Sequence, residues 1–184
     1  LNCVIISMSR AGTTTSAGSS NNHNPLSDCI GYSEMVIGGK KHSILKNLNG
    51  SISKISFDNS LNAANAEPED VTKLCLGRCV KKIDWETFRD TKSLSGEVFL
   101  PLSLKEIRTY AFYETGPIEI DFSLSVLSYL GGRTFQKSKI KNKVILPNTL
   151  NKIGRDCFKE CYDIEELFIP KSLTDPNNPF EQGD

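Results

Sequence analysis

Four cysteines stand at spacings that could bind a metal. Cys75 and Cys79 are separated by three residues, and so are Cys157 and Cys161. Two such pairs could supply four thiolates to a tetrahedral zinc ion, provided that the fold brings them together. The order of the elements along the chain therefore decides whether a metal site forms.

Residue sets typical of catalysis are absent from the sequence. Its two histidines, His23 and His42, belong to no HExxH motif, and no GxSxG motif presents a serine nucleophile. The sequence GGKK at residues 38–41 resembles a phosphate-binding loop. The Walker motif, however, needs glycine where Glu34 stands and Ser or Thr where Lys41 stands. We expect no enzymatic activity, no catalytic residue, no cofactor and no metal.

Charge and hydropathy exclude two classes of partner. The 22 basic and 22 acidic residues balance to a formal net charge of zero, whereas nucleic acids and acidic membranes select a basic excess. No apolar run reaches the length of about 18 residues that spans a bilayer. Residues 1–9 are too short an apolar stretch for a signal peptide. Because the chain begins with Leu1, we expect a processed or truncated start, or a start codon other than AUG.

The second half of the chain repeats with a period of about 23 residues. Its pattern is Leu-x-x-Ile-x-x-x-x-Phe, with steps of 24, 23 and 23 residues between equivalent positions. The aliphatic anchors are Ile83, Ile107, Leu130 and Ile153, and the aromatic anchors are Phe88, Phe112, Phe135 and Phe158. Such a period is typical of a solenoid, in which stacked units share one core. We expect each set of anchors to form a buried column.

Each unit also carries a short run of alternating apolar residues. These runs lie near residues 74–76, 98–100, 120–122, 144–146 and 167–169. One strand cannot bury its apolar face alone, but stacked strands can do so as a parallel sheet. The pattern predicts an α/β leucine-rich-repeat solenoid with one short parallel strand per unit.

Residues 150–170, LNKIGRDCFKECYDIEELFIP, resemble the BspA-type (treponemal-type) leucine-rich repeat. Its unit reads roughly Leu-x-x-Ile-x-x-x-Ala-Phe-x-x-Cys-x-x-Leu-x-x-Ile-x-Ile-Pro, and LKEIRTYAFYETG from Leu104 is also similar. The resemblance covers about residues 71–173. It implies a protein like the surface adhesins and secreted proteins of anaerobic bacteria, the surface proteins of some parasitic protists, or some phage products.

Regions on either side of the repeats have a different composition. We expect residues 1–70 to form a β-rich or partly flexible cap, with a Ser/Thr/Gly/Asn-rich linker at 11–24. Within it, we predict a hairpin around residues 38–41 and a strand at residues 52–57. Residues 174–184 read as an irregular tail, in which Phe180 could fold back over the last repeat.

The repeat separates the two cysteine pairs. Cys75 and Cys79 belong to the first unit, and Cys157 and Cys161 belong to the fourth, so about 14 Å of strand spacings lie between the pairs. A shared zinc site needs every sulfur about 2.3 Å from the metal. The resemblance assigns Cys157 to the family's alanine position and Cys161 to its cysteine position, which implies small core residues, although a local disulfide is an alternative.

Two further cysteines fall in the N-terminal region. Cys3 and Cys29 could form a disulfide there if the protein is secreted.

One row of apolar residues is predicted to face outward from the sheet. If Val98 points inward, alternation places Phe99, Phe122, Ile145 and Phe168 on the exposed side. Exposed apolar rows often mark contact surfaces. Alternatively, the row stacks on itself, lies beneath the N-terminal region, or is broken by a one-residue shift that turns Ile120 and Phe122 inward.

These observations favour a non-enzymatic binding or adhesion module that acts through the sheet face. The alternative is a structural subunit of a virion or surface layer that packs through the same face. We expect a protein partner or neighbouring subunits, with a host surface protein or glycan as further options, and neither nucleic acid nor membrane insertion. The expected location is extracellular or at the cell surface, or alternatively virion-associated.

Overall fold

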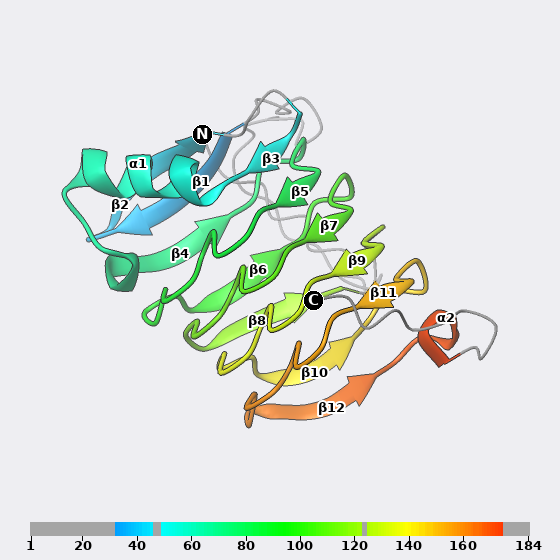
Figure 1. Ribbon diagram of the computed structural model, residues 1–184. Coiled ribbons are helices and arrows are strands. Elements are labelled where there is room, and N and C mark those ends of the chain that lie inside the picture. Colours follow the sequence, from blue (N-terminus) through cyan, green and yellow to red (C-terminus); the bar gives the residue numbers. More distant parts are fainter. Residues whose placement is uncertain (1–31, 46–48, 123–124, 175–184) are drawn as a thin grey trace, which may run out of the picture.

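The computed structural model describes residues 32–45, 49–122 and 125–174, and its repeats form a solenoid of stacked turns (Figure 1). Two rows of short strands run along the solenoid, one on each side of its core. The predicted linker at 11–24, Cys3, Cys29 and Phe180 lie outside the described residues.

The first row contains the longer strands of the repeats. In order these are β4 (Val71–Cys75), β6 (Gly96–Phe99), β8 (Ile118–Asp121), β10 (Asn142–Ile145) and β12 (Ile164–Phe168). β6 pairs with β8 and β10 pairs with β12, both in parallel. The prediction of a parallel arrangement is therefore confirmed for these strands, although most begin two or three residues earlier than expected. We call the solvent side of this row the outer sheet face.

A second row of strands was not predicted. It contains β3 (Ser51–Ile52), β5 (Lys82–Ile83), β7 (Glu106–Ile107), β9 (Tyr129–Leu130) and β11 (Lys152–Ile153), which pair in parallel. The described repeats thus contribute two strands per unit, not one. The second strand is two residues long, which is too short for period-two alternation to appear in the sequence.

The segments between the strands are turns with a repeated backbone conformation. Two positions per unit have positive φ, and they are filled by Glu86, Tyr110, Arg133 and Asp156 and by Asp90, Glu114, Lys137 and Glu160. Left-handed residues at fixed positions let each unit reverse tightly and stack at strand spacing. We call these segments the turn arcs.

The core contains both predicted columns of anchors. Successive rings of Phe88, Phe112, Phe135 and Phe158 lie with centroids 5.2, 5.3 and 5.4 Å apart. The aliphatic column is buried from Ile83 to Leu130 and the aromatic column from Phe88 to Phe135, and the last members, Ile153 and Phe158, are partly exposed. The predicted core columns are therefore confirmed.

Both columns extend one step toward the N-terminus. Ile52 pairs with Ile83, and the Phe57 ring lies 5.1 Å from that of Phe88. The strand predicted at residues 52–57 is wrong, because α1 (Lys54–Ala64) begins there. The Ser53 hydroxyl accepts a hydrogen bond from the Ser56 amide and caps the helix. Phe57 and Leu61, one helical turn apart, are its buried residues.

An antiparallel hairpin covers the N-terminal end. β1 (Tyr32–Ile37) and β2 (Lys40–Leu45) pair as predicted, through a turn in which Gly38 and Gly39 have φ of +54° and +78°. β1 also pairs antiparallel with β4, so the hairpin extends the first row of strands (Figure 1). The short η1 (Pro68–Asp70) leads into β4, and α2 (Lys171–Thr174) follows β12.

Candidate protein-binding face

Three of the four predicted contact residues lie on the outer sheet face. Ile145 is 39% exposed, Phe168 is 46% exposed and Phe99 is partly exposed. Phe122 is fully buried, so its predicted outward position is wrong. Asp121 takes the place opposite Phe99 in the pairing of β6 with β8.

The inward turn of Phe122 follows from a one-residue shift in the third strand. Ile118, Ile120 and Phe122 alternate inward there, whereas Glu119 and Asp121 are exposed. The position of Asp121 beside Phe99 interrupts the apolar row at its middle. The apolar residues of the face are therefore Phe99 on one side of this gap, and Ile145 with Phe168 on the other.

Charged residues form a second row beside the apolar one. On β10 and β12, the Lys143 ammonium lies 3.4 Å from the Glu166 carboxylate and 4.1 Å from the centre of the Phe168 ring. On β6 and β8, Glu97 lies directly opposite Glu119 in the parallel register. The C-terminal part of the face is thus neutralised by pairing, and the central part carries two adjacent carboxylates.

A groove opens on this face between β4 and β6. β4 pairs with β1 and β6 pairs with β8, whereas no strand ladder joins β4 to β6. The groove has a volume of about 260 Å³, and its lining includes Val36, Lys73, Leu74, Cys75, Glu97 and Phe99. The sequence pattern did not reveal it, because its lining combines residues of β1, β2, β4 and β6 that are far apart in the sequence.

The turn arcs carry a cluster of tyrosines and cations that the sequence analysis missed. The guanidinium of Arg89 lies 5.0 Å from the centre of the Tyr113 ring, and those of Arg89 and Arg133 lie 5.7 and 5.6 Å from that of Tyr110. Lys137 lies 5.5 Å from the Tyr113 ring. These residues recur at equivalent positions of adjacent units, and the repeat alignment could have brought them together.

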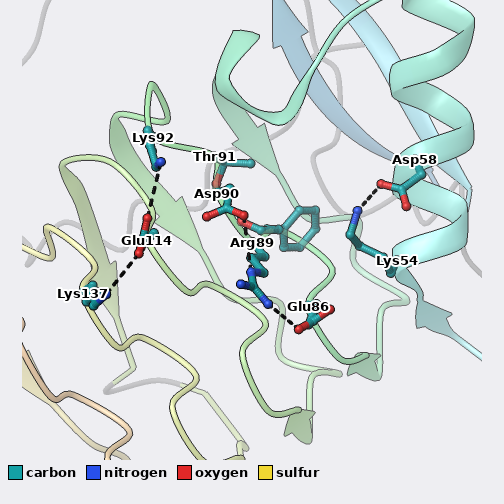
Figure 2. Close-up of polar contacts among 10 residues, drawn as sticks. Lys54, Asp58, Glu86, Arg89, Asp90, Thr91, Lys92, Glu114 and Lys137 are labelled. Carbon is teal, nitrogen blue, oxygen red and sulfur yellow. Dashed lines mark hydrogen bonds and ion pairs between the residues drawn. The ribbon is translucent and has the colours of Figure 1, made fainter.

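Ion pairs link the same arcs across units (Figure 2). Glu114 lies 3.4 Å from both Lys92 and Lys137, and Arg89 lies 2.6 Å from Glu86. Burial alone would raise the pKa of the Glu114 carboxyl, but hydrogen bonds from Tyr113, Lys92 and Lys137 outweigh it and lower that pKa. The Glu114 ion pairs thus join adjacent stacked units, whereas the pair of Arg89 with Glu86 lies within one unit.

Two large aromatic side chains on the described turn arcs are exposed, and the more exposed of them is Tyr162, at 85%. Trp85 is 66% exposed, immediately before the left-handed residue Glu86. It lies on a turn arc and not among the residues of the outer sheet face, so the two surfaces can be tested separately.

The cysteines have structural states that the sequence left open. Cys75 and Cys79 each take part in a disulfide bond. Cys157 and Cys161 are free thiols, and burial raises the pKa of Cys157 to about 12 and that of Cys161 to about 11. The Cys161 thiol lies 2.8 Å from the Phe135 carbonyl oxygen. Within the described part of the chain, no group of three or more histidine, cysteine or acidic residues could hold a metal.

The fold defines the chain as a leucine-rich-repeat solenoid built of parallel strands. Residues 51–181 match the family described as BspA type leucine-rich repeat region, in six copies, and the chain belongs to this family. The match confirms the resemblance to the BspA-type repeat. It begins at residue 51, so it includes the unit that contains Ile52 and Phe57. No curated protein and no solved structure matches the chain. Among the described residues, no helix has the length and apolar character to cross a membrane.

Proposed function

We propose that this protein is a non-enzymatic recognition or adhesion module that binds a protein partner through its outer sheet face. The observation that carries the proposal is the outward position of Phe99 on β6 and of Ile145 and Phe168 on the adjacent strands β10 and β12 of the same face. Repeats of this family suggest protein interaction or adhesion. A partner that covers these side chains would remove apolar surface from water, which contributes roughly 25 cal/mol per Å².

The proposed location is extracellular or at the cell surface. The disulfide bonds of Cys75 and Cys79 support it, because disulfides persist in oxidising compartments and are rare in the cytosol. A virion-associated location is the alternative, and it accompanies the second candidate function.

That second function is a structural subunit that assembles through the C-terminal end of the solenoid. Leu167 and Ile169 are 41% and 56% exposed, whereas Val144 and Leu146, one unit earlier, are 0% and 4% exposed. These inward positions are exposed because no further unit is stacked on them within the described residues. A neighbouring subunit seated on this end would bury them as an internal unit does.

The double substitution Phe99→Ser with Phe168→Ser tests the first function. The purified chain is immobilised, and the proteins that it captures from an extract of candidate host cells are quantified against Ile55→Ser. Ile55 is 72% exposed on α1 and provides a control with similar loss of apolar surface away from the face. We expect the captured set to be lost in the double variant alone, with melting temperatures close to the wild type. Unchanged capture by the folded double variant would contradict the proposal.

Leu167→Ser with Ile169→Ser tests the second function. Sedimentation velocity of the wild-type chain over a concentration series measures self-association. Oligomers that disappear in this variant and persist in Phe99→Ser with Phe168→Ser would favour assembly through the end. A wild-type chain that sediments as a monomer at every concentration would contradict it.

A further inference from the structure

Within the described residues, two carboxylates on the outer sheet face have no ion-pair partner. Glu97 on β6 and Glu119 on β8 lie opposite each other in the parallel register, and both are exposed. Neither forms an ion pair or a side-chain hydrogen bond with another residue of the described ranges 32–45, 49–122 and 125–174. Like charges placed directly across neighbouring strands are destabilising. The folded chain therefore keeps an unfavourable charge pair at the centre of this face.

Two other carboxylates on the same face form ion pairs. Glu34 lies 3.1 Å from Lys41, and Glu166 lies 3.4 Å from Lys143. The unpaired carboxylates lie on β6, which borders the groove, and on β8, the next strand. Glu97 itself lines the groove, together with Phe99.

The groove provides an apolar surface next to these carboxylates. Val36, Leu74 and Phe99 contribute to its apolar lining. The charged residues of the lining are Glu34 and Lys41, which pair with each other, and Lys73 and Glu97. Its volume of about 260 Å³ is below the range of about 300–1,000 Å³ that is typical of small-molecule sites. A space of this size suits one apolar side chain of a polypeptide that lies across the face.

We infer that the outer sheet face binds a basic polypeptide segment, which places one apolar side chain in the groove beside Phe99 and Lys or Arg side chains over Glu97 and Glu119. The inference rests on the proposed function and specifies the chemistry of the partner. Binding would remove the repulsion between the two carboxylates and cover the apolar lining in one step. Because the carboxylates are exposed, the attraction is screened by salt.

A labelled peptide, GKKFKKG, is the probe, and fluorescence anisotropy with the full chain measures its Kd. The control peptides are GKKSKKG, which lacks the apolar side chain, and GEEFEEG, which reverses the charge. We expect GKKFKKG to bind at least about fivefold more tightly than either control. Its Kd should rise several-fold between low and physiological salt. Equal binding of GKKFKKG and GEEFEEG, or no binding of either, would overturn the inference.

Glu97→Gln with Glu119→Gln removes the carboxylates and keeps the shape of the side chains. We expect the Kd for GKKFKKG to rise at least about fivefold in this variant, since both charged contacts are lost. Its melting temperature should be unchanged or higher, because the repulsion is also removed. Glu69→Gln with Asp163→Asn is the matched control, since both are exposed and lie off this face. An equal loss in both double variants would refute a local role for Glu97 and Glu119.

The two proposals fail in different ways. Capture that is abolished by Phe99→Ser with Phe168→Ser, but unchanged by Glu97→Gln with Glu119→Gln, refutes the basic partner and leaves the protein-binding face intact. Capture that survives the serine substitutions refutes the binding face itself.

Discussion

The ring of Phe122 packs edge-on against the ring of Phe135, with centroids 5.8 Å apart and planes inclined by 87°. This contact places Phe122 in the same core as the aromatic column, in contrast to Phe168 on the outer sheet face. Phe122→Ala should reduce the free energy of unfolding by about 3–5 kcal/mol, because it leaves a cavity. Phe168→Ala should reduce it by about 0.5 kcal/mol or less. Urea unfolding of both variants measures the difference, and equal losses would contradict the burial of Phe122.

Gly131→Ala tests how closely successive turns approach. A Cβ at Gly131 would lie 2.3 Å from the Thr109 backbone nitrogen, so neighbouring units would have to separate. We expect a loss of about 1–3 kcal/mol in the free energy of unfolding. At Gly96 a Cβ would meet no atom within 4 Å, although its φ is +83°. Gly96→Ala should therefore cost only the backbone strain, about 1 kcal/mol. A larger effect at Gly96 than at Gly131 would show that the close approach is wrong.

Cys157 and Cys161 should resist alkylation in the folded protein. Burial holds their pKa values at about 12 and about 11, so the thiolate that attacks iodoacetamide is scarce at pH 8. Mass spectrometry after native labelling should show both thiols unmodified. Labelling in denaturant without a reductant should modify both. Modification of either thiol at native conditions, at the rate of a free cysteine, would contradict the raised pKa values.

Glu114 should make stability depend on pH. Its folded pKa is lowered from the ordinary value of 4.5, so its contribution is present above that value and is lost as the pH falls through the folded pKa. Because the side chain is 27% exposed, we expect Glu114→Gln to cost about 0.2–1 kcal/mol at pH 7. The difference from wild type should vanish in strong acid. Melting curves from pH 7 to pH 2 measure it, with Glu69→Gln as the control. A cost that is constant with pH would argue against the ion pairs.

The sequence alone determined the repeat and the identity of its core. The recurrence of Ile83, Ile107 and Leu130, with a phenylalanine five residues after each, follows from local spacing, and stacking at a fixed period requires it. The same spacing between Ile52 and Phe57 was present in the sequence, but its alternating pattern was interpreted as a strand. The segment is a helix instead, because the Ser53 side chain caps its N-terminus, and this helix buries the same phenylalanine, Phe57.

Only the tertiary structure decided what the outer sheet face presents. A one-residue shift in the third unit turns Phe122 inward and Asp121 outward, and a local pattern of alternating residues cannot fix the parity of a strand relative to its neighbours. The groove beside Phe99 lies between β4 and β6, which no strand ladder joins, and it is lined by residues of β1, β2, β4 and β6 that are far apart in the sequence. Short-range periodicity determines which residues of one strand share a face. Register and the choice of strand partner, which are long-range, set which of them meet water.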